Sequence, residues 1–346
     1  MGNSINTIGG KEMKWKTIVI TCISILFIGI LTACNSEKTA NRSEKNEVKI
    51  GYFPNLTHVA TIIALENDYF QEEFSDDVKI KTKTVSNGGL FMEAMATNDI
   101  DVGTIGPAPL LNFFAKDPKY YIISGAVNGG AVLVGNKHSN VKQLKDLDGK
   151  RVAIPVIGST QDIMLRKALK DVQLKPTTSE GTVELYASAP ADTATLFTQK
   201  SVDAAATQEP WGHVLEKEVN GELLLDWDEF AWGKDSTNTV VAASQSFIEN
   251  EELVEAYLRA HTKAVKFIKE NPEESQNLVI KHIKELTGKE LDKSELEAAF
   301  KRLEVTTSVN EQVLQEMADI SKEAGYIPTN KIDGVFQLSF LQEIEK

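Results

Sequence analysis

The alternation of apolar and polar residues predicts short strands separated by helices from residue 48 onward. Strands are predicted at 48–52, 78–82, 101–106 and 120–125. The stretches between them have the spacing of amphipathic helices, near 58–67, around 91–95 and after residue 107. Strands that alternate with helices at this spacing are typical of a parallel, doubly wound sheet.

The same alternation returns after residue 130 and predicts a second α/β lobe. Its strands are predicted at 131–135, 151–154, 183–186 and 202–207. A last β-rich run follows at 239–243, and everything beyond about Glu249 is expected to be helical.

Two α/β lobes are therefore expected. Lobe 1 would comprise residues 47–130 and 240–346, and lobe 2 residues 131–239. The chain would cross between them near 128–134 and 237–243. Because ligands of open α/β sheets bind beyond the carboxyl ends of the strands, both lobes would face a shared cleft.

The first 46 residues have a different pattern. Three lysines, Lys11, Lys14 and Lys16, precede an apolar run over residues 18–31. This run is roughly 14 residues long, shorter than the ~20 that span a bilayer as a helix. A basic segment, a short apolar segment and small residues before a cysteine are typical of a secretory signal peptide.

The segment Leu31-Thr32-Ala33-Cys34 resembles the bacterial lipobox, whose cysteine is acylated and becomes the new N-terminus. We therefore expect residues 1–33 to be a lipoprotein signal peptide and Cys34 to carry the lipid. Residues 34–46 are polar and would form a flexible tether. The alternative is an uncleaved N-terminal anchor, and translation would start at Met1 or Met13.

Charge and cysteine content exclude several classes of protein. The net charge is −13, and removal of the predicted signal peptide leaves about −15, which argues against nucleic-acid binding. The two cysteines, Cys22 and Cys34, both precede the predicted fold. Cysteine catalysis, cysteine–zinc sites and iron–sulfur clusters in that fold are therefore excluded.

Motifs of enzymes and metal sites are also missing from the sequence. It contains no serine nucleophile elbow, no His-Glu-x-x-His motif and no phosphate-binding loop. The five histidines lack the spacing of a metal cluster: they are His58, His138, His213, His261 and His282. We expect no catalytic residues, no cofactor and no metal.

Several segments resemble the substrate-binding proteins of ABC importers, most closely the nitrate/sulfonate/taurine branch. Besides the lipobox, they are Ile50-Gly51-Tyr52, the segments 102–109 and 144–153, Gly158-Ser159-Thr160, Ala189-Pro190-Ala191-Asp192, Val202-Asp203-Ala204 and Glu209-Pro210-Trp211. The resemblance covers essentially the whole mature chain. It implies a type II periplasmic-binding-protein fold, with two doubly wound α/β lobes and a ligand cleft between them.

The resemblance also implies partners and a location. The chain would be a monomer that binds a small anionic solute and delivers it to an ABC permease with its ATPase. It would contact the cell membrane through its lipid anchor alone, on the extracytoplasmic face.

The residues themselves favour capture of an anion. Gly158-Ser159-Thr160-Gln161 lies at a strand-to-helix junction, where free amides and the positive end of the helix dipole attract an oxyanion. Gly88-Gly89 and Gly106-Pro107-Ala108 would do the same from lobe 1. The alternatives are a plain N-cap at Ser159 and a simple turn at Gly88-Gly89.

Further candidate ligand contacts follow the resemblance. They are Tyr52, Phe53, Asn55 and His58 on the cleft wall, Asn128 at the first crossing, Asp192 at a helix start, Glu209, and Trp211. Glu209 would accept from a ligand amine or hydroxyl, and Trp211 would stack on the ligand. Each aromatic residue equally suits core packing, His58 suits a surface helix start, and Asp192 suits a helix cap.

The expected ligand is an aliphatic sulfonate or taurine, followed by nitrate or bicarbonate. Proteins of this fold also bind phosphonate or phosphite, thiamine-pyrimidine precursors and riboflavin. The other alternative is an enzyme on the same fold that resembles a pyrimidine synthase.

Overall fold

The computed structural model describes residues 1–2, 47–288 and 291–346. The chain divides into two units, Met1–Lys45 and Asn46–Lys346, and the fold described below is that of the second. Cys34, the tether and nearly all of the predicted signal peptide lie outside the described residues. Within the described ranges, no helix combines the length and apolar character needed to cross a bilayer.

The strands form two separate sheets, which confirms the two predicted α/β lobes. The first sheet has the order β11-β4-β10-β3-β1-β2. Its strands are β1 (Glu47–Tyr52), β2 (Lys79–Thr84), β3 (Val102–Ile105), β4 (Tyr120–Gly129), β10 (Thr237–Ser244) and β11 (Leu303–Val305). We call this sheet and its helices lobe 1.

The second sheet has the order β7-β6-β8-β5-β9. Its strands are β5 (Ala131–Gly135), β6 (Arg151–Ile154), β7 (Glu184–Ala187), β8 (Ala204–Gln208) and β9 (Glu222–Leu225). We call this sheet and its helices lobe 2. The chain enters it directly from β4 through Gly129 and Gly130, and returns to lobe 1 at β10.

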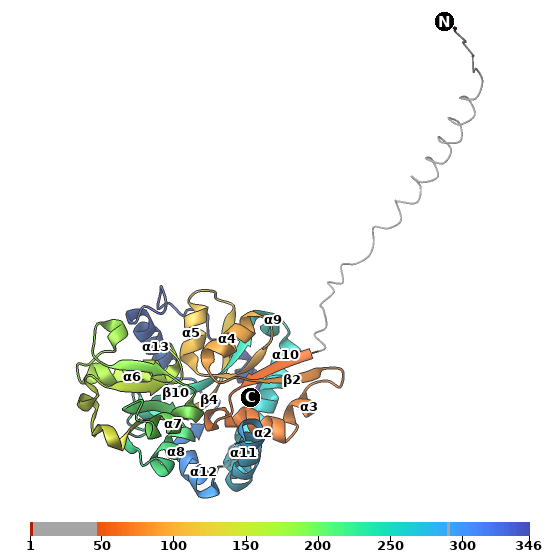
Figure 1. The fold of residues 1–346 in the computed structure, drawn as a ribbon. Helices are drawn as coiled ribbons and strands as arrows, with labels where there is room; N and C mark the ends of the chain where they lie inside the picture. The colour runs from red at the N-terminus through yellow and green to blue at the C-terminus, as the bar shows by residue number, and fades with distance from the viewer. Residues whose placement is uncertain (3–46, 289–290) are drawn as a thin grey trace. The chain divides into compact units, whose positions relative to one another are not determined.

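Helices cover both sheets (Figure 1). Those of lobe 1 are η1 (Leu56–His58), α2 (Val59–Glu66), α3 (Tyr69–Glu73), α4 (Gly88–Ala96), α5 (Pro107–Phe114), α9 (Gln245–Ile248), α10 (Glu251–Glu270), α11 (Pro272–Thr287), α12 (Lys293–Phe300), α13 (Glu311–Glu323) and α14 (Ser339–Ile344). Those of lobe 2 are η2 (Lys137–Ser139), η3 (Leu144–Leu147), α6 (Thr160–Asp171), η4 (Thr177–Ser179), η5 (Pro190–Asp192), α7 (Thr193–Thr198), α8 (Trp211–Glu218) and η6 (Gly233–Asp235).

The prediction of parallel strands is confirmed for β1 with β2 and β3 and for β6 with β7 and β8, but the strands near the crossings are antiparallel. β4 and β10 are antiparallel to each other, and β10 is antiparallel to β3. In lobe 2, β5 is antiparallel to both β8 and β9. A parallel neighbour needs a helical crossover, whereas β10 enters lobe 1 directly from the other sheet and runs in the opposite direction.

The C-terminal third is less uniformly helical than the pattern predicts. β11 pairs antiparallel with β4, and Phe336 forms an isolated bridge with Ile122. β9 in lobe 2 is also a strand that the pattern did not indicate. These segments are short and become extended because they add to the edge of an existing sheet.

The core of lobe 1 occupies both faces of its sheet. All residues of β3 and β10 are buried, as expected for strands that are covered on both sides. The long helix α10 packs against α2 and α3 on one face, through residues such as Tyr257 and Phe70. α5 and α13 belong to the apolar cluster of the other face, which includes Leu111 and Met317.

Two facing glycines allow β1 and β3 to lie close together. Gly51 and Gly103 are register partners. A Cβ on Gly103 would lie 2.0 Å from the carbonyl oxygen of Gly51, and a Cβ on Gly51 would lie 2.5 Å from the ring of Phe91. The first clash involves backbone, so it cannot be relieved by a side-chain rotation.

Gly103→Ala is therefore expected to reduce the free energy of unfolding by about 3 kcal/mol, because it forces β1 and β3 apart. Urea unfolding followed by circular dichroism measures this loss. The control is Gly149→Ala, whose Cβ meets no atom within 4 Å although its φ is +69°. It should cost only about 1 kcal/mol, and equal losses in the two variants would contradict the clash.

Candidate functional site

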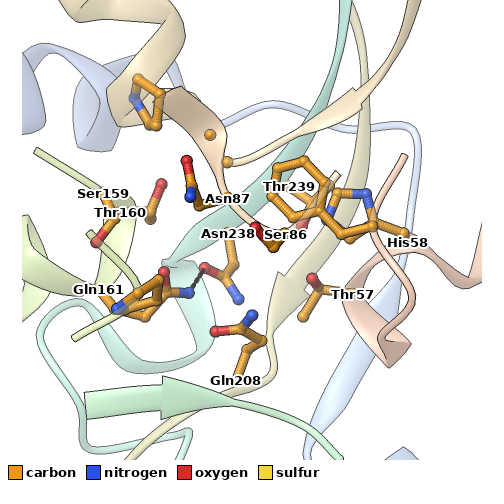
Figure 2. A pocket seen from close by; sticks show the side chains of 15 residues that line it. Thr57, His58, Ser86, Asn87, Ser159, Thr160, Gln161, Gln208, Asn238 and Thr239 are labelled. Carbon is orange, nitrogen blue, oxygen red and sulfur yellow. Dashed lines mark hydrogen bonds between the residues drawn. The ribbon is translucent and has the colours of Figure 1, made fainter. Parts of the chain in front are cut away.

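A narrow cavity lies where the two lobes meet. Its volume is about 370 Å³. Lobe 1 lines it with Phe53, Thr57, His58, Ser86, Asn87, Gly88, Gly106, Pro109, Asn238 and Thr239, and lobe 2 with Pro155, Ser159, Thr160, Gln161 and Gln208. Figure 2 shows these side chains converging from both lobes.

Three helices begin at this cavity. The N-cap residues are Asn87 for α4, Gly106 for α5 and Ser159 for α6, and all three line the cavity. The side chain of Asn87 accepts from the Leu90 amide at 3.0 Å. A helix N-terminus carries a partial positive charge and unpaired amides, so three of them at one cavity favour an anion.

Backbone amides remain available at two of these helix starts. The N–H groups of Gly88, Thr160 and Gln161 make no hydrogen bond with any described residue. Since all three residues line the cavity, an oxyanion there would find donors from α4 of lobe 1 and from α6 of lobe 2.

The hydroxyl groups of Ser159 and Thr160 are accepting rather than donating within the protein. Ser159 Oγ accepts from the Asp162 amide at 3.2 Å, and Thr160 Oγ1 accepts from the Ala108 amide of lobe 1 at 3.3 Å. Each hydroxyl therefore keeps its own proton for a further acceptor.

Close approach of the lobes at this point requires a glycine. A Cβ on Gly106 would lie 2.4 Å from Thr160 Oγ1. Gly106 thus allows the N-terminus of α5 to reach the N-terminus of α6 across the cavity.

The cavity contains no ionised side chain among its described lining residues. Aspartate, glutamate, lysine and arginine are absent from the lining, and His58 is its one titratable residue. Burial lowers the pKa of His58 to about 3, although its hydrogen bond with Thr104 acts in the opposite direction. The imidazole is therefore neutral at physiological pH, and the electrostatic attraction for an anion comes from dipoles.

The structure brings together part of the predicted site. Seven of the predicted residues line the cavity: Phe53, His58, Gly88, Gly106, Ser159, Thr160 and Gln161. Gly89 and Gly158 line an adjoining cavity of about 550 Å³. Pro107 and Ala108 form the first turn of α5, directly after Gly106.

Five other predicted contacts lie outside the cavity lining. Tyr52 is buried in the lobe 1 core and contacts His282 Nε2 through its hydroxyl at 2.8 Å. Asn55 caps η1, Asn128 pairs with Thr237 in the sheet, and Trp211 is a buried core residue. Asp192 is at the N-cap of α7, but its side chain makes no capping hydrogen bond.

Glu209 also lies outside the cavity lining, and both of its carboxylate oxygens have protein partners. Oε1 accepts from Arg302 Nη1 at 2.9 Å and Oε2 from the His213 amide at 3.0 Å. Arg302 comes from lobe 1 and also pairs with Glu216 and Asp226 of lobe 2. Glu209 is thus a fully buried member of an ion cluster that joins the lobes.

Sequence reasoning missed several lining residues: Thr57, Ser86, Asn87, Gln208, Asn238 and Thr239. Asn87 had a usable signal, since an asparagine before a predicted helix is a preferred N-cap. Asn238 and Gln208 lie in strands and have no such signal. Asn238 Oδ1 accepts from Gln161 Nε2 at 3.4 Å, a contact between lobes that Figure 2 shows as a dashed line.

Comparison with known proteins gives consistent results. Residues 41–283 match the model of the NMT1-like family. A Brucella abortus protein that is named as a binding protein is 26% identical over 299 residues, covering 86% of this chain and 85% of that protein. The taurine-binding periplasmic protein of Escherichia coli is 24% identical over 217 residues, covering 62% of this chain and 64% of that protein.

Solved structures agree on the fold. The alkanesulfonate-binding protein SsuA of Xanthomonas axonopodis pv. citri, bound to MOPS, has a TM-score of 0.71 at 19% identity, covering 85% of this chain and 98% of that one. The nitrate-binding protein NrtA of Synechocystis PCC 6803 has a TM-score of 0.68 at 16% identity, covering 87% of this chain and 88% of that one. The predicted periplasmic-binding-protein fold is thereby confirmed.

The raised pKa of the Glu209 carboxyl predicts that the stability of the fold depends on pH. Burial raises its pKa to about 7 from an ordinary value of 4.5, although Arg302 and the His213 amide act in the opposite direction. Between these two values the unfolded chain gives up a proton that the folded chain retains, so rising pH disfavours the folded state.

We therefore expect the free energy of unfolding of the wild type, relative to Glu209→Gln, to fall by about 3 kcal/mol between pH 4.5 and 7 and then to level off. Chemical denaturation of both proteins across this range measures the difference. Glu218→Gln, which removes an exposed carboxylate from α8, the helix that follows Glu209, is the control for the loss of one acidic group. A flat difference for Glu209→Gln would contradict the raised pKa.

Proposed function

The chain belongs to the NMT1-like family, and we propose that it is the extracytoplasmic solute-binding component of an ABC importer that captures a small anion. The observation that carries the proposal is the meeting of three helix N-termini at a cavity whose described lining residues include no ionised side chain.

The capture of the anion is assigned to dipoles and hydrogen bonds. The amides of Gly88, Thr160 and Gln161 and the hydroxyls of Ser159 and Thr160 point to an oxyanion with several acceptor atoms. A favourable, partly buried helix terminus contributes up to about 2 kcal/mol toward an anion. Three such termini with added hydrogen bonds can therefore hold a monoanion without a lysine or arginine.

The ligand class is proposed from the site and from the relatives together. Proteins named for taurine, alkanesulfonate and nitrate share this fold or sequence similarity. A sulfonate or nitrate group presents three oxygens to the donors described above. The apolar part of an aliphatic sulfonate would pack on Phe53, the aromatic ring among the lining residues.

Binding is proposed to close the lobes. A ligand favours closure only through contacts that exist in the closed form, and here the donors come from α4 in lobe 1 and α6 in lobe 2. The narrowness of the cavity fits a closed form that excludes water from the solute. We infer that the closed form is the one delivered to the permease and its ATPase.

Binding rather than catalysis is the role that the lining residues support. Acid–base chemistry needs a group that titrates near the working pH. The one titratable residue among the described lining residues, His58, is neutral and hydrogen-bonds to Thr104 Oγ1 at 2.8 Å.

We further propose that Cys34 is lipidated and attaches a monomeric protein to the extracytoplasmic face of the cell membrane.

A thermal-shift screen of the purified protein against alkanesulfonates, taurine, nitrate, bicarbonate, pyrimidines and flavins tests the ligand class. A ligand present at 100 times its Kd stabilises the fold by about 2.7 kcal/mol through mass action. We expect the sulfonates, taurine or nitrate to raise the melting temperature. A rise with pyrimidines or flavins alone would overturn the anion assignment in favour of a heteroaromatic ligand.

The double substitution Ser159→Ala with Thr160→Ala tests the α6 site. It removes two hydroxyl donors to the anion, so we expect the Kd to rise about 100-fold, as measured by isothermal titration calorimetry. Ser244→Ala is the matched control, because Ser244 caps α9 by accepting from the Phe247 amide and does not line the cavity. It should lower stability by about 1 kcal/mol without changing the Kd. An unchanged Kd in the double variant would show that these hydroxyls do not contact the ligand.

A further inference from the structure

The Tyr326 hydroxyl connects lobe 1 to the first turn of α6 in lobe 2. Tyr326 follows α13 in the chain. Its hydroxyl donates to Asp162 Oδ2 at 2.7 Å, and Arg166 Nη2 donates to the same hydroxyl. The guanidinium of Arg166 also lies over the Tyr326 ring, 4.9 Å from its centroid.

Asp162 transmits this contact to the turn that precedes α6. Its carboxylate is completely buried, and Oδ2, which accepts from Tyr326, also accepts from the Gly158 amide at 2.8 Å. The other oxygen, Oδ1, accepts from Arg166 Nε at 2.9 Å. One carboxylate therefore holds the turn at Gly158 and the hydroxyl from the opposite lobe together.

The same turn is held by lobe 1 at a second point. Asn112 Nδ2, from α5, donates to the carbonyl of Gly158 at 3.2 Å. Gly158 has a φ of +79°, a conformation that L side chains rarely adopt. Ser159 and Thr160 follow directly, so the position of this turn decides where the proposed anion donors of α6 lie.

Opening of the lobes would break some of these contacts and leave others. Tyr326 to Asp162 and Asn112 to Gly158 join different lobes, whereas Arg166 and Asp162 are four residues apart in α6. Arg166 is further held by Ser179 Oγ and Thr178 Oγ1 of lobe 2, each at 2.9 Å. The buried carboxylate thus keeps its counter-ion in an open form, and opening mainly removes the hydrogen bonds to the Gly158 turn.

We infer that Tyr326 is a positioning residue that sets the release rate of the solute from outside the cavity. Its hydroxyl, acting through Asp162, holds the Gly158 turn and the N-terminus of α6 in the geometry that binds the anion. The inference about release rests on the proposed binding function. The effect on the turn itself does not, because these hydrogen bonds join residues of this chain to one another.

The test is Tyr326→Phe, which removes the hydroxyl and keeps the ring over Arg166. Tyr121→Phe is the matched control, because the Tyr121 hydroxyl donates to the Pro118 carbonyl within lobe 1. Hydrogen exchange of the full chain, alone and with the sulfonate or nitrate found in the screen, is followed by mass spectrometry for the peptide 156–163. Stopped-flow binding of the sulfonate or nitrate found in the screen measures kon and koff.

We expect exchange in peptide 156–163 to become about tenfold faster in Tyr326→Phe and to stay unchanged in Tyr121→Phe. The koff should rise about tenfold while kon stays within about twofold of the wild type. Unchanged exchange would overturn the inference, and so would faster exchange with an unchanged koff. If the wild type binds no anion, the proposed function fails, and the exchange measurement still decides whether Tyr326 holds the turn.

Discussion

The arrangement of the two lobes depends most on the contact between Arg302 of lobe 1 and the buried carboxylate of Glu209 in lobe 2. Glu209 follows β8, and its amide donates at 2.8 Å to the carbonyl of Gly130, where the chain first crosses from lobe 1 to lobe 2. A carboxylate in this position is costly unless it is paired and hydrogen-bonded. Arg302 supplies the pairing and also contacts Glu216 and Asp226, so one side chain joins lobe 1 to three acidic residues of lobe 2.

This ion cluster and the Tyr326 contact differ in how they join the lobes. Arg302 is held by several charged partners, and removing any one partner would leave the others. Tyr326 contributes one hydroxyl to an ion pair, Asp162 with Arg166, that is complete within α6. The first arrangement suits a permanent attachment near the crossing strands, and the second suits a contact that can form and break.

The cavity between these attachments offers dipoles, and no formal charge among its described lining residues, to the proposed anion. Ionised side chains are placed at the lobe–lobe contacts, while the described lining residues offer helix termini, hydroxyls and amides. Fixed dipoles inside a protein act more strongly than in water. Because the described lining residues include no cation, release of the proposed anion would leave no buried positive charge unpaired.

Local patterns in the sequence determined the strands other than β9 and β11, several helix starts and the Gly158-Ser159-Thr160-Gln161 part of the candidate site. Each of these depends on neighbouring residues: alternation along a strand, an N-cap before a helix, or a glycine at a turn. The two-lobe α/β class follows from the same local information.

Contacts between segments distant in the chain were decided by the tertiary structure alone. Glu209 and Trp211 were predicted from the sequence to contact the ligand. In the structure, Glu209 pairs with Arg302, and Trp211 packs in the apolar core. Asn238 and Gln208 enter the cavity although nothing adjacent to them in the chain marks them. The antiparallel direction of β10 likewise follows from its return out of the other lobe. The physical reason is that burial and pairing of a polar group depend on which remote residue lies against it, and local periodicity carries no information about that neighbour.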